Sequence, residues 1–279
     1  MAAPDSLQEQ LRRAARFALH DRRASWHGRF APPSDNDPEH LAVELSDAAM
    51  WPDILDAECA QQALVPGKNG KEHLLTFLPP RHFALRYWCV MILSERYNGL
   101  WQIRLDARYL GSASARSLFL GRTSENGHAL DAWKSGQRAR FLLKFDIRSF
   151  YPSISHEVLL ENIGSKYADP SAVEQAAMEL LPRLLRYRYR PVDSSDLHLC
   201  ERGLPIGNTT ERFFSNLYLS PLDDYLLAQG DVSSSRRLDD IRVYGNDRER
   251  LEEIQDRLEH ISHRLRVEAN LAKTTIVAR

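Results

Sequence analysis

Two strand-forming runs in this chain meet aspartate residues, and this pattern constrains the fold more than any other feature. Residues 140–145 (RFLLKF) are β-prone, and Asp146 follows them directly. A second β-prone segment, 236–244 (RRLDDIRVY), carries Asp239 and Asp240 where we expect a hairpin turn. Carboxylates are ligands that Mg²⁺ prefers, and paired metal ions catalyse phosphoryl transfer. The pattern therefore predicts a sheet with a catalytic metal site at its strand ends.

Helical periodicity accounts for most of the remaining chain. From Arg248 onward, apolar residues recur at intervals of three and four, as on one face of a helix. We expect helices over residues 1–24, 41–63 with a break near Trp51, 81–97, 156–163, 171–187, 209–227 and from 248, with closing strands at 265–267 and 274–277. This order is typical of an α+β fold with a helix-backed sheet. A second acidic pair, Asp223-Asp224, is interpreted as a solvated helix surface.

The composition excludes several classes of protein. Hydrophobic residues make up 43% of the 279 positions and charged residues 27%, as in globular proteins. No run approaches the roughly 20 apolar residues that span a bilayer, and the N-terminus lacks a secretory signal, so we expect no membrane contact. Three scattered cysteines favour a reducing, cytoplasmic setting. His260 and His263 share a helix face without an evident third ligand, and are interpreted as a polar surface.

Charge is balanced overall but uneven along the chain. There are 37 basic and 38 acidic residues, a net charge of −1, whereas nucleic-acid binding usually leaves a basic signature. Residues 101–145 nevertheless carry eight Lys or Arg against three acids, and residues 183–190 (RLLRYRYR) carry four arginines and no acid. A basic face on a neutral protein is compatible with these segments.

Five segments resemble motifs of bacterial reverse transcriptases. Residues 144–154 (KFDIRSFYPSI) resemble motif A, and residues 203–219 (GLPIGNTTERFFSNLYL) resemble motif B. Residues 237–241 (RLDDI) lie where motif C is expected, residues 270–274 (NLAKT) resemble motif D, and residues 117–130 are similar to a fingers motif. The resemblance implies an α+β, reverse-transcriptase-like right-hand polymerase with fingers and palm but no recognisable thumb. It also implies an RNA-directed DNA polymerase, a nucleotidyltransferase.

The motifs also imply residue roles. By similarity, the catalytic residues are Asp146, Asp239 and Asp240. The metal-binding residues are these three aspartates and Ile147, with Mg²⁺ as the cofactor and Mn²⁺ as a substitute. Tyr151 lies at the position of the aromatic steric gate that favours deoxynucleotides; core packing beside Phe150 is its alternative role. The nucleotide-binding residues implied in this way are Arg116, Arg122, Phe150, Tyr151, Gly207, Asn208 and Lys273. Solvated loop positions are the alternative for the two arginines.

The chain departs from the family pattern at three positions. Ile206 replaces a common glutamine, so that motif B resembles reverse transcriptases of diversity-generating retroelements. Glu211 replaces serine, and Arg237 replaces the tyrosine before the Asp pair; these changes concern fidelity and primer handling. Residues 244–247 (YGND) are a poorer motif C, because they place Asn246 at a metal-ligand position and leave no second strand.

The resemblance suggests a division of the chain and a set of partners. We expect an N-terminal helical extension (1–75), a fingers-like region (76–143) and a palm with motifs A to D (144–279). The implied partners are an RNA template or noncoding RNA, a DNA product, deoxynucleoside triphosphates and a protein that supplies the missing thumb function. Similarity to abortive-infection and defence-associated groups suggests a bacterial antiviral or retroelement setting.

Two other functions use the same features. Template-independent or protein-primed DNA synthesis would employ the same aspartates. A catalytically idle, RNA-binding scaffold fits the altered motifs, although three converging negative charges have no use in a scaffold. A signalling nucleotidyltransferase is disfavoured because the motif B loop serves a template strand.

Overall fold

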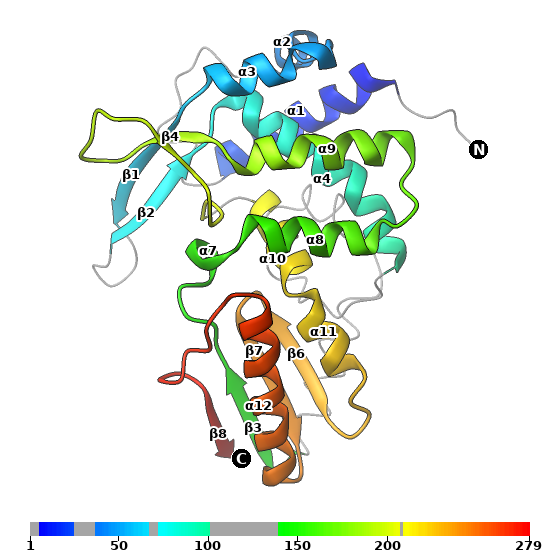
Figure 1. The fold of residues 1–279 in the computed structure, drawn as a ribbon, viewed down its shortest axis with the longest axis vertical. Helices are drawn as coiled ribbons and strands as arrows, with labels where there is room; N and C mark the ends of the chain where they lie inside the picture. Colours follow the sequence, from blue (N-terminus) through cyan, green and yellow to red (C-terminus); the bar gives the residue numbers. More distant parts are fainter. Residues whose placement is uncertain (1–5, 25–36, 67–71, 101–138, 207–208) are drawn as a thin grey trace.

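The computed structural model describes residues 6–24, 37–66, 72–100, 139–206 and 209–279. Figure 1 shows an upper part of helices with a small sheet, and a lower part with a second sheet. The helices are α1 (Leu7–Ala24), α2 (Pro38–Glu44), η3 (Ala48–Met50), α3 (Trp51–Ala57), α4 (Pro80–Leu100), α7 (Phe150–Ser153), α8 (His156–Lys166), α9 (Ala172–Leu185), α10 (Thr209–Tyr218), α11 (Ser220–Leu227) and α12 (Arg248–Arg264). The strands are β1 (Ala60–Pro66), β2 (Glu72–Phe77), β3 (Phe141–Phe145), β4 (Arg188–Arg190), β5 (His198–Leu199), β6 (Ser233–Arg237), β7 (Asp240–Gly245) and β8 (Thr275–Ala278).

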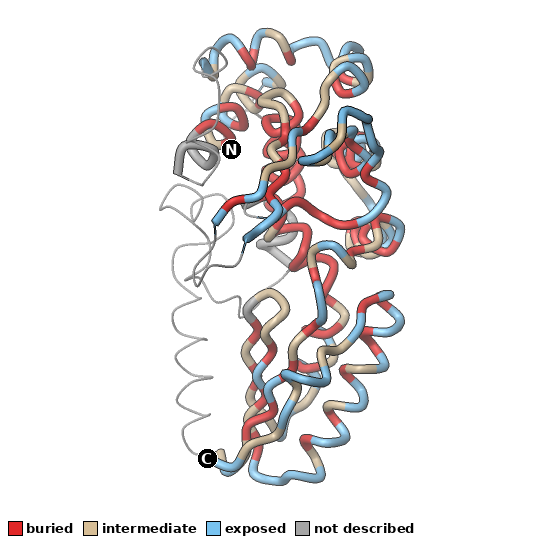
Figure 2. Tube along the Cα trace, turned by 90° about the vertical axis from the view of Figure 1, so that its left-hand side faces the viewer, coloured by how far each residue is buried: buried red, intermediate tan, exposed pale blue. Residues whose placement is uncertain are grey.

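The lower sheet follows the expected hairpin and strands. Its order is β6-β7-β3-β8, all antiparallel, with Phe145 of β3 opposite Ile241 of β7. Helix α12 packs against β3 and β7 with the apolar face that the sequence indicated. Asp247 caps this helix by accepting a hydrogen bond from the Glu249 N–H. In Figure 2, buried and exposed positions alternate along α12, as expected for a helix with one face on a sheet.

The upper sheet joins segments that are far apart in the sequence. Its order is β2-β1-β4-β5. Strands β1 and β2 form an antiparallel hairpin, and β1 also pairs in parallel with β4, where Ala60 lies opposite Tyr189. The sheet therefore connects the N-terminal third of the chain with residues that precede motif B.

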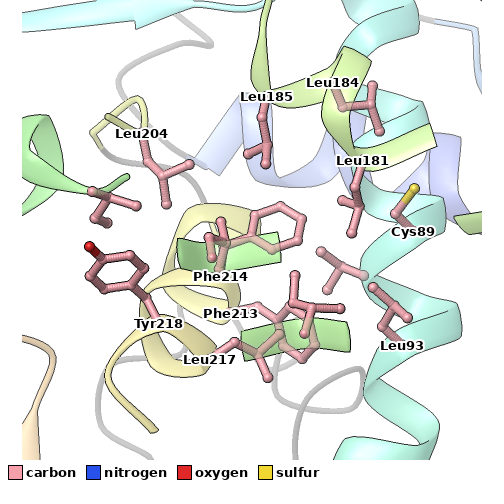
Figure 3. Packing of buried hydrophobic residues seen from close by; sticks show 14 of the residues in the cluster. Cys89, Leu93, Leu181, Leu184, Leu185, Leu204, Phe213, Phe214, Leu217 and Tyr218 are labelled. Carbon is pink, nitrogen blue, oxygen red and sulfur yellow. The ribbon is translucent and has the colours of Figure 1, made fainter. Parts of the chain in front are cut away.

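Helix α4 lies at the centre of the upper core, in contact with α1, α9 and α10. Its residues from Phe83 to Leu93 are almost all buried, because neighbours cover it on several sides. Figure 3 shows side chains from α4, α9 and α10 meeting in this core, including Cys89, Leu93, Leu181, Leu184, Leu185, Phe213, Phe214 and Leu217. The core fixes α10, which follows the motif B loop, against the upper helices.

The structure corrects several expected elements. Residues 60–63 begin strand β1 rather than ending a helix, because β4 and β2 offer hydrogen-bonding partners on both sides. Residues 265–267 form no strand; Arg266 has a positive φ of 58°, which ends the helix in a turn. The helix expected over 209–227 is two helices, since Pro221 begins α11 at a position that favours a helix start.

Strands β2, β4 and β5 and the first residues of β6 were not expected as strands. Strands β4 and β5 lie within the region expected to be palm, and residues 233–235 extend β6 ahead of the β-prone segment 236–244. The boundary placed between residues 75 and 76 falls inside β2, and residues 60–75 are largely strand rather than helical extension. Short strands of this kind depend on partners distant in the chain, which their own residues do not identify.

Candidate active site

Asp146 lies at the end of β3, as the sequence predicted, and the motif D segment folds over it. The Asp146 carbonyl accepts a hydrogen bond of 2.8 Å from the Asn270 N–H. The Lys273 ammonium lies 3.1 Å from Oδ2 and 3.4 Å from Oδ1 of the Asp146 carboxylate. The Asp146 side chain is 18% exposed and that of Lys273 is 68% exposed, so the lysine covers the carboxylate from the solvent side.

Asp239 and Asp240 lie at the tip of the β6–β7 hairpin. Arg237 pairs with Asp240, so Leu238 and Asp239 are the two loop residues. Leu238 has a φ of 54°, in the left-handed region that a two-residue hairpin loop requires of its first residue. The Asp240 carboxylate receives a hydrogen bond of 3.2 Å from the Arg242 guanidinium.

The three aspartates share one end of the sheet. The β3–β7 register ends with Phe145 opposite Ile241, and its continuation places Asp146 beside Asp240. Burial raises the pKa of Asp239, and the negative charges of Asp146 and Asp240 act in the same direction, against Lys273. The Asp146 and Asp240 carboxylates are therefore close enough to act on Asp239, and a cation would relieve this repulsion.

The donor chemistry of this group suits a hard divalent cation, which prefers carboxylate oxygens. In the described parts of the chain, no three His, Cys, Asp or Glu residues are grouped closely enough to hold a metal ion. Two of the three aspartates instead contact basic side chains, because Lys273 pairs with Asp146 and Arg242 pairs with Asp240. The raised pKa of Asp239 bears more directly on cation binding than the separation of the side chains does. Rotation of the aspartate side chains would bring the carboxylates together without any movement of the strands.

Ile147 could contact a metal ion only through its backbone carbonyl. The side chain is buried, and the residue forms an isolated antiparallel bridge with Ala269. The hydrogen bonds that frame the bridge belong to its neighbours, from the Arg148 N–H to Glu268 and from the Asn270 N–H to Asp146. The Ile147 carbonyl consequently points away from Ala269, as in any pair of this type.

Tyr151 and Phe150 occupy different environments in α7. Phe150 is buried in the core, with its ring 6.3 Å from that of Tyr218, so its side chain does not line the site. Tyr151 is half-buried. Burial raises the pKa of Tyr151 to about 12, and the negative charge of Asp239 acts in the same direction. A hydrogen bond with Ser215 opposes this rise. Tyr151 thus lies between the core and the aspartates, which is compatible with both roles considered for it.

Four of the expected nucleotide-binding residues lie outside the described residues: Arg116, Arg122, Gly207 and Asn208. Besides Phe150 and Tyr151, the described residues include Lys273, whose contact with Asp146 places it at the candidate site. Ile206, which ends the described part of the motif B loop, is 37% exposed.

Comparison with known protein families identifies the family of this chain. The reverse transcriptase (RNA-dependent DNA polymerase) family matches residues 100–279, which is more than half of the chain. The chain belongs to the reverse transcriptase family. Members of this family are nucleotidyltransferases that act as RNA-directed DNA polymerases. In a separate comparison, no curated protein matches the chain.

Solved structures confirm the α+β, reverse-transcriptase-like fold. Telomerase of Candida albicans, in complex with a fragment of telomeric RNA, is 15% identical with a TM-score of 0.56 over 86% of this chain and 46% of the telomerase chain. Apo telomerase of Candida tropicalis is 12% identical with a TM-score of 0.56 over 78% of this chain and 44% of that chain. This reverse transcriptase spans about half the length of the telomerase chains that it matches.

Sequence reasoning missed a buried ion pair beneath the aspartate hairpin of this reverse transcriptase. Asp223, interpreted as a solvated residue, is buried, and its Oδ1 accepts a hydrogen bond of 2.6 Å from Nε of Arg236. Only Asp224 is exposed, where it pairs with Lys166. The helical period could have shown the difference, because Asp223 lies three residues before Leu226 on the buried face of α11.

A second buried ion pair supports the motif B helix of this reverse transcriptase. Arg86 of α4 and Glu211 of α10 are both fully buried, with Nη1 of Arg86 2.5 Å from Oε1 of Glu211. Arg86 also donates to the Leu184 carbonyl and lies 5.4 Å from the centre of the Tyr187 ring. The unusual glutamate in motif B therefore has a structural partner.

A hollow of about 790 Å³ lies elsewhere on this reverse transcriptase. Residues of α3, α9, β4 and β5 line it, including Arg183, Arg186 and Arg188. Asp146, Asp239 and Asp240 do not line it, so we place the candidate active site at these three carboxylates and not at this hollow. Among the described helices, none is both long and apolar enough to cross a bilayer.

Proposed function

We propose that this chain is an RNA-directed DNA polymerase that uses Asp146, Asp239 and Asp240 to hold two divalent metal ions. The observation that supports the proposal is the position of all three aspartates at one end of the β3–β7 pair. They come from separate strands of a reverse-transcriptase fold, and the repulsion among them favours a cation. Mg²⁺ is the expected ion, and Mn²⁺ is expected to substitute.

The chain's own residues have distinct proposed tasks. Bound ions would activate the primer hydroxyl and stabilise the leaving pyrophosphate, while the protein positions the reacting groups. Asp146, Asp239 and Asp240 would hold the ions, and the Ile147 carbonyl would add an oxygen ligand. Lys273 is exposed beyond its contact with Asp146, so a triphosphate would compete for its ammonium. The Tyr151 ring would pack where a ribose 2′-hydroxyl projects.

The substrates that we propose are an RNA template or noncoding RNA, a DNA primer and product, and deoxynucleoside triphosphates. A bacterial retroelement or antiviral defence system in the cytoplasm is the proposed setting, supported by the motif B resemblance. A protein partner that grips the duplex product belongs to the same proposal.

The decisive experiment is incorporation of labelled deoxynucleotides by the purified protein on a primed RNA template, with Mg²⁺ or Mn²⁺. Asp239→Ala/Asp240→Ala is the test variant, and Asp224→Asn, on an exposed surface, is the control. Template-length product from the parent and the control alone supports the proposal. Product whose sequence does not copy the template would instead establish untemplated synthesis on the same aspartates.

The scaffold alternative is favoured by one observation, the pairing of two of the three aspartates with basic side chains. Thermal unfolding with and without Mn²⁺ distinguishes the two functions. Binding of a metal ion to the folded protein raises the midpoint of unfolding, and the rise grows with the metal concentration; Asp239→Ala should remove this rise. A midpoint that Mn²⁺ leaves unchanged in the parent, together with no incorporation, would favour the scaffold.

A further inference from the structure

The backbone at the tip of the aspartate hairpin adopts an unfavourable conformation. Leu238 directly precedes Asp239 and has a φ of 54°. A residue with a Cβ rarely adopts this conformation, and it persists where surrounding contacts hold it. Glycine or asparagine would satisfy such a turn more easily. Other contacts must therefore stabilise the loop.

One guanidinium supplies such contacts. Arg236 lies two residues before Leu238, in β6, and its Nη1 donates a hydrogen bond of 3.1 Å to the Leu238 carbonyl. The same nitrogen donates to Oδ1 of Asn216, in α10, at 3.0 Å. Because Nη1 carries two protons, both contacts can form at once.

The Asp223 carboxylate binds the other two nitrogens of the Arg236 guanidinium. Nε of Arg236 lies 2.6 Å from Oδ1 of Asp223, and Nη2 contacts Oδ2 of the same carboxylate. This bidentate contact fixes the plane of the guanidinium, and so the direction in which Nη1 points. Arg236, Asp223 and Asn216 are each less than 10% exposed, so water competes little for these hydrogen bonds.

We propose that Arg236 is a positioning residue that holds the Leu238 carbonyl and thereby fixes the direction in which Asp239 and Asp240 leave the hairpin tip. Asp223 and Asn216 hold Arg236 in turn, which couples the hairpin to α11 and α10. This inference rests on the proposed metal-binding role of the aspartates.

The test separates positioning from simple stabilisation. Arg236→Lys keeps the charge opposite Asp223 but lacks the planar fork that reaches Leu238. Arg236→Met/Asp223→Leu removes both charges and retains apolar volume, and such exchanges of buried ion pairs often preserve stability. Asp224→Asn is the matched control, since it changes the adjacent, exposed aspartate.

Two measurements apply to every variant that folds with a parent-like unfolding midpoint. Hydrogen–deuterium exchange of the peptide covering residues 236–242 reports the order of the hairpin without metal or substrate. The Mn²⁺ dependence of thermal unfolding reports metal affinity without catalysis. We expect faster exchange and roughly 10- to 100-fold weaker metal binding in both Arg236 variants, the usual effect of removing an outer-shell partner, and no change in Asp224→Asn.

Contrary outcomes are distinguishable. Parent-like exchange and metal dependence in Arg236→Met/Asp223→Leu would overturn the positioning role. Failure of both Arg236 variants to fold would assign the ion pair to overall stability and also overturn it. If Mn²⁺ does not stabilise the parent, the proposed metal site itself fails, whereas the exchange result still reports on the hairpin.

Discussion

The surroundings of Asp239 disfavour the charged carboxylate that its proposed role requires. Burial raises its pKa, and the neighbouring carboxylates act in the same direction. The folded chain therefore binds the Asp239 proton more tightly than the unfolded chain does. The associated stability is present below the ordinary aspartate pKa and is lost as the pH rises through the raised value.

Asp239→Asn should accordingly stabilise the protein while inactivating it. In EDTA at pH 7.5 we expect a higher unfolding midpoint than in the parent, and the difference should vanish at acidic pH. Incorporation should fall by at least roughly 100-fold, since changes to outer-shell groups alone cost 10- to 100-fold. Thermal unfolding across a pH series and single-nucleotide incorporation measure the two effects. A variant less stable than the parent at pH 7.5 would contradict the argument from repulsion.

Tyr151 gives a second test at the residue scale. If its ring packs against the sugar, Tyr151→Ala should raise the use of ribonucleotides relative to deoxynucleotides by about 10-fold or more. Tyr151→Phe keeps the ring and should keep the discrimination, although it removes the hydroxyl bonded to Ser215. Competition between the two nucleotide types on one template gives the ratio. Equal ratios in the parent and the alanine variant would assign Tyr151 to core packing.

At the scale of elements, the ion pair between Arg86 and Glu211 links α4 to the motif B helix α10. Both side chains are fully buried, and an unpaired charge in such a site is costly. Arg86→Met should destabilise the fold by about 3–5 kcal/mol. Arg86→Met/Glu211→Leu should recover most of this loss, because no buried charge is left unpaired.

Urea unfolding of the parent, the single variant and the double variant measures these differences. The exposed pair of Arg248 and Glu252 on α12 is the control, for which a comparable change should cost less than about 1 kcal/mol. A double variant no more stable than Arg86→Met would show that the apolar replacements do not fit the site.

At the scale of the whole molecule, one strand concentrates positive charge on a chain that is nearly neutral. Arg186, Arg188 and Arg190 are exposed and alternate with Tyr187, which is buried, and Tyr189, which is half-buried. This alternation places Arg188 and Arg190 on one side of β4, and Arg186 lies just before the strand, at the end of α9. The basic segment noted in the sequence is therefore an exposed surface in the upper part of Figure 1, apart from the aspartates.

We expect this surface to contribute to RNA binding. Arg188→Ala/Arg190→Ala should weaken binding of a single-stranded RNA and lower the slope of log affinity against log salt by about 0.7 for each phosphate that the protein no longer neutralises. Fluorescence anisotropy at several salt concentrations measures the slope. Arg248→Ala/Arg257→Ala, on α12, is the control, and an equal decrease in slope there would point to general charge rather than to β4.

Local patterns in the chain were sufficient to predict the lower sheet and its aspartates. Strand β3 with Asp146 and the β6–β7 hairpin around Asp239 and Asp240 appear where the β-prone runs predicted them, and helix α12 appears where apolar periodicity predicted it. Each depends on residues close together in sequence, whose spacing reports which face is buried. The same patterns indicated the α+β class, and the motif resemblance indicated the family.

Contacts between distant residues account for what the sequence did not reveal. Strand β1 exists because it pairs with β2 and with β4, where Ala60 meets Tyr189. Asp223 is buried rather than solvated because Arg236 reaches it from another element. A residue's partner across the fold depends on how helices and strands pack, so its burial and charge environment follow from the assembled structure and not from its neighbours in the chain.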